Sequence, residues 1–73
     1  MQAQRGGSAS VISDLTQAIT LGSTSAEVFR TRGDAHIRRN ARDLAIADYR
    51  RAVQADSNDQ TSRTALRRLG ARP

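Results

Sequence analysis

Two segments of this chain match each other at a spacing of 34 residues. The identical pairs at this spacing are Ile12 and Ile46, Asp14 and Asp48, Ala18 and Ala52, and Ser23 and Ser57. Two further pairs are apolar in both copies: Leu15 with Tyr49, and Ile19 with Val53. A fixed internal period of this size indicates a repeat architecture, in which each unit buries its apolar face against its neighbours.

The use of alanine and proline favours helices over strands. Alanine, which has the highest helix propensity, supplies 12 of the 73 residues. The single proline is the last residue, Pro73, so no proline interrupts a helix inside the chain. Runs of β-branched or aromatic residues are few. We therefore predict an all-α fold with a thin core, in which antiparallel helices approach closely through small residues.

Apolar periodicity and capping residues predict where the helices begin and end. Gly22 ends the first helix, and Asn40 ends the second, because both residues tolerate a left-handed backbone. Thr24 and Glu27 are spaced as in a capping box, and Ser57 to Asp59 reads as a turn and cap. The four predicted helices span about 9–21, 26–39, 42–55 and 60–70.

The same periodicity predicts which side chains face inward. In the second helix, Gly33 is expected at a close contact between helices, since only a small residue permits it. The residues predicted to be buried are Phe29, Gly33, His36 and Ile37 in the second helix, Ala45, Ile46, Tyr49, Ala52 and Val53 in the third, and Ala65, Leu66 and Leu69 in the fourth.

Five of these residues form a spaced series, namely Phe29, Gly33, Ala45, Tyr49 and Ala52. In order and spacing this series resembles the tetratricopeptide repeat family, whose period is also about 34 residues. The family pattern has an aromatic, a Leu-Gly pair and a tyrosine on the first helix, then Ala-x-x-x-aromatic on the second. Three positions depart from it: Arg32 replaces the leucine, His36 the tyrosine and Ser57 the closing proline.

The resemblance implies a short stretch of a helical superhelix. Residues 9–25 would form the second helix of a partial repeat, residues 26–59 one complete repeat, and residues 60–70 a capping helix. Residues 1–8 are expected to form a flexible, polar lead-in. Arg67 stands one period after Gly33, and a polar residue there suits the outer face of a terminal unit.

The resemblance also implies a protein-interaction scaffold or adaptor whose concave surface holds a peptide or a partner helix. Carried over by position, that surface presents Glu27, Arg30, Thr31, Asp34, Ile37 and Arg38. Two interpretations of its charges stay open. An Arg30–Asp34–Arg38 ladder within the helix, worth about 0.2–0.5 kcal/mol per pair, is favoured over two arginines that bind an acidic peptide. In some family members an asparagine at the position of Asp34 helps to hold the terminal carboxylate of a bound chain. The negative charge of Asp34 argues against that activity here.

The first helix has no preceding partner in the implied arrangement, so we expect part of its apolar stripe to be open. Ile12, Leu15 and Ile19 form that stripe. Self-association into a homo-oligomer through these residues is therefore a second prediction.

Residues for catalysis or metal binding are scarce. The chain has no cysteine and no lysine, and its one histidine, His36, is expected to be a packed core residue. No nucleophile–base set, metal-ligand spacing or phosphate loop is present. We predict neither an enzyme nor a cofactor or metal site. No run approaches the roughly 18 apolar residues that span a membrane.

The net charge of +5 is concentrated at the end of the chain. Residues 60–73 hold Arg63, Arg67, Arg68 and Arg72 without an acidic residue, while the other 59 residues carry eight arginines and seven acids. A solvated surface is the favoured interpretation of this basic tail. The alternative is a helical module that binds nucleic acid or another polyanion. That alternative is disfavoured because no aromatic residue lies among the arginines for base stacking.

Overall fold

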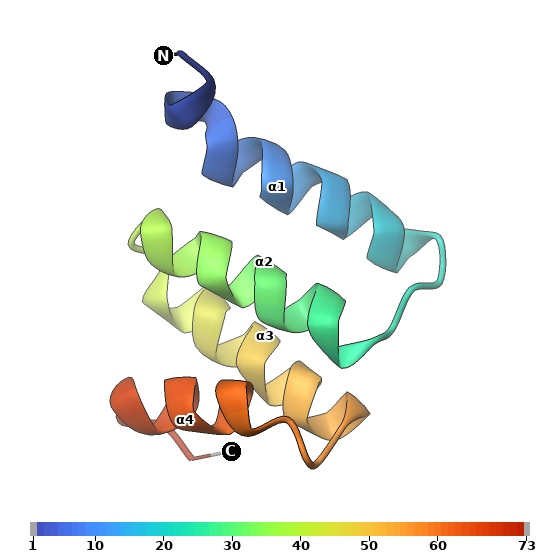
Figure 1. Cartoon of the computed structure of the whole chain (residues 1–73), viewed down its shortest axis with the longest axis vertical. Helices are drawn as coiled ribbons and strands as arrows, with labels where there is room; N and C mark the ends of the chain where they lie inside the picture. Colours follow the sequence, from blue (N-terminus) through green and yellow to red (C-terminus); the bar gives the residue numbers. More distant parts are fainter. Residues whose placement is uncertain (1, 73) are drawn as a thin grey trace.

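The chain folds into four helices with antiparallel neighbours, and the computed structural model describes residues 2–72 (Figure 1). The helices are α1 (Gln2–Thr20), α2 (Ala26–Arg38), α3 (Arg42–Ala55) and α4 (Gln60–Arg68). Residues 2–72 contain no strand, so the all-α prediction is confirmed. The bounds of α2 and α3 lie within one residue of the predicted ones, whereas α4 ends two residues early.

The first helix begins earlier than the sequence predicted. We expected residues 1–8 to be flexible, but α1 is helical from Gln2; Met1 lies outside the described residues. Once a helix has formed, each added residue gains a hydrogen bond at a modest entropic cost. The segment 2–8 has no proline to stop this extension. Its two glycines cost about 1 kcal/mol each relative to alanine, which weakens the extension without ending it.

Helices α1, α2 and α4 end at a residue with a left-handed backbone. Gly22, Asn40 and Gly70 have φ angles of 111°, 61° and 76°. The N–H that follows each of them bonds to a carbonyl five residues back, which satisfies the open helix end. These bonds run from Ser23 to Ala18 at 2.9 Å, and from Ala41 to His36 and Ala71 to Leu66 at 2.8 Å each. The predicted roles of Gly22 and Asn40 are confirmed.

Helices α2 and α4 begin at capping residues, Ser25 and Asp59, that are 34 positions apart. Each side chain accepts a hydrogen bond from the backbone N–H three residues later, at 3.4 and 3.1 Å. The predicted cap at Asp59 is confirmed. The predicted capping box of Thr24 and Glu27 is wrong, because α2 starts one residue later than the box requires. Val28, and not Glu27, therefore occupies the third helical position.

The helices pack in the order of the chain. α2 packs most extensively on α3, and α1 and α4 cover the outer sides of this pair (Figure 1). α1 contributes no fully buried side chain among those described; its Ile12, Leu15 and Ile19 are half-buried. The fully buried apolar residues are Phe29, Ala35, Ala45, Tyr49, Ala52 and Leu66. Because half of these are alanine, the core is as thin as the composition predicted.

Most residues predicted to face inward do so, with one exception. Ile46, Val53, Ala65 and Leu69 surround the core and are half-buried, as is His36. Ile37 is wrongly predicted as buried, since 37% of it is exposed. It lies on the edge of α2 that faces α4 across a groove, where no helix covers it.

Gly33 occupies the close helix contact predicted for it. A Cβ atom added there would lie 2.9 Å from Cε1 of Tyr49 and 3.1 Å from Cδ1 and Cζ. The first distance is shorter than Cβ atoms approach other heavy atoms in proteins, and the other two are tighter than ordinary contacts. The aromatic ring of α3 therefore packs directly on the backbone of α2.

Replacing Gly33 with alanine is expected to lower the free energy of unfolding by about 1 kcal/mol. Overpacking a filled site costs about 1–3 kcal/mol, which outweighs the gain of about 1 kcal/mol in helix propensity. Urea denaturation measures the difference. The control is Gly7→Ala in α1, where nothing lies within 4 Å of the added Cβ and the change is expected to stabilise. A Gly33→Ala variant as stable as this control would contradict the close contact.

Candidate binding groove

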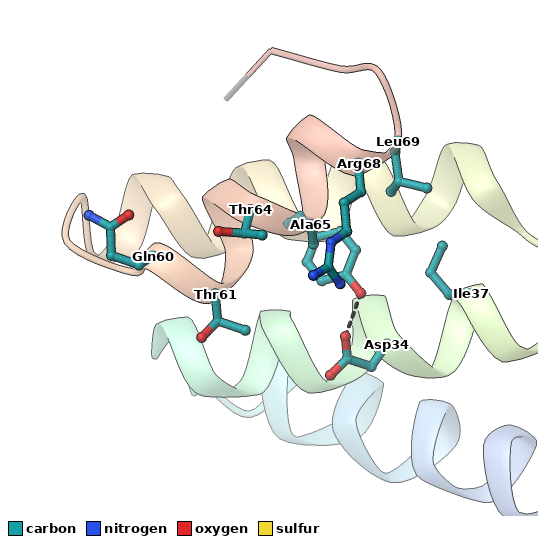
Figure 2. Close-up of a pocket in the computed structure, with 9 residues that line it drawn as sticks. Asp34, Ile37, Gln60, Thr61, Thr64, Ala65, Arg68 and Leu69 are labelled. Carbon is teal, nitrogen blue, oxygen red and sulfur yellow. Dashed lines mark hydrogen bonds between the residues drawn. The ribbon is translucent and has the colours of Figure 1, made fainter.

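A groove of about 510 Å³ runs between α2 and α4 (Figure 2). Helix α3 lies beneath it and contributes Tyr49. The walls mix apolar, hydroxyl and charged side chains, and Figure 2 shows Arg68 reaching from α4 into the space above Asp34. The lining residues are Asp34, Ile37, Tyr49, Gln60, Thr61, Thr64, Ala65, Arg68 and Leu69.

The α4 wall of the groove is related by the 34-residue period to the concave face that the sequence predicted on α2. Five α4 residues line the groove: Gln60, Thr61, Thr64, Ala65 and Arg68. The last four stand 34 positions after Glu27, Arg30, Thr31 and Asp34 of the predicted concave face, and of these α2 residues Asp34 itself lines the groove. The predicted concave face covers only the α2 wall. Adding one period to that set would have found most of the α4 wall.

Of the six residues predicted to bind a partner, the structure places two in the groove, Asp34 and Ile37. The side chains of Glu27, Thr31 and Arg38 are exposed on α2 but do not line it. Arg30 is half-buried and is committed to another contact.

That contact joins α2 to the start of α4. Nη1 of Arg30 lies 3.0 Å from Oδ2 of Asp59, the capping residue of α4. Ser62 also donates to this carboxylate, from its backbone N–H at 3.1 Å and its hydroxyl at 2.9 Å. No ion pair joins Asp34 to Arg30 or Arg38 among the described residues. The favoured ladder within α2 is therefore wrong, because Arg30 reaches a carboxylate on the neighbouring helix instead.

The environment of Asp59 makes the fold sensitive to acid. Burial by itself would raise the pKa of Asp59, but the two hydrogen bonds from Ser62 and the pairing with Arg30 hold it below its ordinary value of 3.8. A carboxyl group whose pKa is lower in the folded state stabilises that state above the unfolded pKa. This contribution is lost as the pH falls below about 3.8.

An Asp59→Asn variant tests this contribution. It is expected to be less stable than the parent chain at neutral pH, and the difference in unfolding free energy should shrink as the pH falls below about 3.8. Urea denaturation at a series of pH values measures it. A difference that stays constant from neutral to acidic pH would contradict a charged Asp59 in the folded state.

Asp34 accepts a hydrogen bond from the Tyr49 hydroxyl at the base of the groove (Figure 2). Burial of the ring and this hydrogen bond raise the pKa of Tyr49 well above its ordinary value of 10.0. The phenol is therefore neutral at all physiological pH values and remains a donor to Asp34. This bond fixes the position of the one carboxylate that lines the groove.

A second polar cluster lies between the helices, away from the groove. Nε and Nη2 of Arg32 donate to the two carboxylate oxygens of Asp48 at 2.8 and 2.7 Å. Nε2 of His36 lies 3.4 Å from the same carboxylate, and Arg32 also donates to the Thr16 hydroxyl at 3.2 Å. The bidentate bonds to Asp48 raise the pKa of Arg32 above its ordinary value, although burial opposes this. This cluster ties together α1, α2 and α3.

The sequence does not predict this cluster. Arg32 stands where the resembled family has a leucine, and the prediction for His36 is only that it packs in the core. One feature of the sequence could have indicated it: both copies carry an aspartate at the same position, Asp14 and Asp48. In the structure only Asp48 is buried; Asp14 is exposed.

The four arginines of the basic tail have different surroundings. Arg63 is half-buried and donates to the Ser57 carbonyl at 3.1 Å. Arg67, Arg68 and Arg72 are exposed, and the backbone carbonyl of Arg72 accepts from Arg50 at 3.0 Å.

Searches against protein-family models, curated proteins and solved structures each found no match to this chain. Within the described residues, no three side chains of the metal-binding types gather into a group that could hold a metal ion. In that same part of the chain, no helix has the length and apolar character needed to cross a bilayer.

Proposed function

We propose that this chain is a tetratricopeptide-type interaction module that binds a peptide or partner helix in the groove between α2 and α4. The supporting observation is the groove itself, which lies between α2 and α4 and is lined by Asp34 and, one period later, by Arg68. The 34-residue spacing of the caps Ser25 and Asp59 supports the same repeat frame. The volume of about 510 Å³ falls in the range of known ligand-binding clefts.

A groove-filling substitution tests this proposal. Peptides selected from a random library for binding to the chain should lose at least tenfold in affinity for Thr61→Trp, because the indole would occupy the groove. Thr24→Trp, in the exposed loop before α2, is the matched control and should bind as the parent does. Circular dichroism checks that both variants fold. Failure to select any peptide, or equal binding by both variants, would overturn the proposal.

Self-association through α1 remains a separate prediction. Ile12, Leu15 and Ile19 are half-buried, and α1 packs on α2, so the apolar stripe is partly covered within the chain. Sedimentation at high micromolar concentration tests the prediction. A strict monomer would remove it.

The alternative from another class is a basic module that binds nucleic acid. The burial of both aromatic residues, Phe29 and Tyr49, weakens it, because base stacking needs an accessible aromatic face. A titration of RNA binding against salt decides between the two classes, since phosphate contacts give a steep dependence on salt concentration.

A further inference from the structure

Four arginines gather at one end of the molecule. Helices α2 and α4 run in the same direction, so their carboxyl ends lie at the same end of the fold (Figure 1). Arg38 and Arg39 end α2, and Arg67 and Arg68 end α4; all four are exposed. No ion pair links any of them to a carboxylate within residues 2–72. We call these four residues the arginine end.

Stabilisation of the helices does not account for the whole arginine end. The carboxyl end of a helix carries roughly half a negative charge, which a nearby cation balances. Two helix ends therefore call for about one positive charge in total. Arg42, which donates to the Leu69 carbonyl, already supplies one, and the four arginines come in addition to it. Two acidic residues lie nearby: Asp34 in the groove, which accepts from Tyr49, and Asp43 in the first turn of α3. The remaining excess of positive charge faces solvent and is free to attract an anionic partner.

The groove opens onto this end through apolar residues. Ile37, Ala65 and Leu69 line it together with Arg68. Ile37 is the most exposed apolar side chain among the groove residues. An apolar side chain of a bound peptide can therefore sit beside Ile37 and Leu69, next to the arginines.

The chemistry of this end favours a peptide over a nucleic acid. Base stacking requires an accessible aromatic face, but Phe29 and Tyr49 are only 5% and 3% exposed. Guanidinium groups bind carboxylates through paired hydrogen bonds. An apolar contact next to several free guanidinium groups matches a peptide that carries an apolar residue followed by acidic ones.

We infer that the groove binds an acidic peptide segment, with an apolar side chain between Ile37 and Leu69 and the following Asp or Glu residues paired with the arginine end. The inference rests on the proposed peptide-binding function and adds the charge of the partner and its direction in the groove. The apolar residue lies within the groove, and the acidic residues leave it at the carboxyl ends of α2 and α4.

Fluorescence anisotropy tests the inference with a labelled peptide that has one leucine followed by four glutamates. Matched probes replace the glutamates with lysines, or the leucine with serine, and a short uridine RNA is the fourth probe. The leucine–glutamate peptide is expected to bind best, and its affinity should fall as salt is added. The paired substitutions Arg67→Gln with Arg68→Gln, and Arg38→Gln with Arg39→Gln, should each weaken it about tenfold.

The control variant carries the same change in charge at the opposite end of the molecule. Arg51→Gln with Arg63→Gln removes two arginines near the end of α3 and the start of α4, and it should bind as the parent does. Equal weakening by this control would show an effect of net charge alone and would overturn the inference.

The outcomes separate the inference from the function on which it rests. If library peptides bind in the groove but the arginine pairs do not matter, the inference is wrong and the proposed function stands. If neither library peptides nor the leucine–glutamate peptide binds, both are wrong. Tighter binding of the RNA than of the acidic peptide would also overturn the inference.

Discussion

Replacing Asp48 with alanine is expected to destabilise the chain by about 3–5 kcal/mol, because it leaves a largely buried guanidinium without its partner. Asp48 is 3% exposed and receives both the bidentate pair from Arg32 and the contact with His36. Domains of this kind are stable by only about 5–15 kcal/mol. The loss is therefore a large share of the total, and thermal unfolding followed by circular dichroism should shift to a much lower midpoint.

The chain supplies a matched control for this result. Asp14 holds the same position one period earlier but is exposed, so Asp14→Ala should change stability by no more than about 0.5 kcal/mol. The double variant Arg32→Leu with Asp48→Ala removes both charges and should recover most of the loss. If Asp14→Ala and Asp48→Ala destabilise equally, or if the double variant is no better than Asp48→Ala, the ion pair is not the cause.

Replacing Leu66 with alanine is expected to cost about 2–5 kcal/mol. Leu66 is completely buried and belongs to the core cluster with Ala45 and Tyr49, so its removal loses apolar burial and leaves a cavity. Among the described side chains that are less than 2% exposed, it is the largest. Because half of the fully buried apolar residues are alanine, few neighbouring side chains can move to refill the space.

The effect of Leu66→Ala should extend to binding. Leu66 holds α4 against α3, and α4 forms one wall of the groove. Peptide affinity should therefore fall together with the stability of α4, measured by hydrogen exchange of its backbone amides. Leu44→Ala is the control, since Leu44 is 56% exposed. A cost below about 1 kcal/mol for Leu66→Ala would show that α4 is held by other contacts.

Local features of the chain predicted most of the secondary structure. The bounds of α3, the cap at Asp59 and the left-handed residues Gly22 and Asn40 all follow from propensity and capping, which depend on residues close in sequence. The start of α1 was the main error. Two glycines suggested a flexible segment, but helix extension needs only the absence of a strong interruption.

The candidate site was predicted in part. The sequence identified the α2 wall through Asp34 and Ile37, and the repeat period contained the information for the α4 wall. The sequence did not indicate that Arg30 pairs with Asp59 and so does not line the groove. That contact depends on how the start of α4 approaches α2.

By itself, then, the sequence determined the helical class, the 34-residue period and the close contact at Gly33, since each depends on local propensity or on a spacing that can be counted along the chain. Only the tertiary structure decided which charges are paired. Asp14 and Asp48 occupy equivalent positions, yet one faces solvent and the other is enclosed by Arg32 and His36. The physical reason is that burial and pairing depend on which helices lie against a residue, and equal positions in a repeat can have different neighbours.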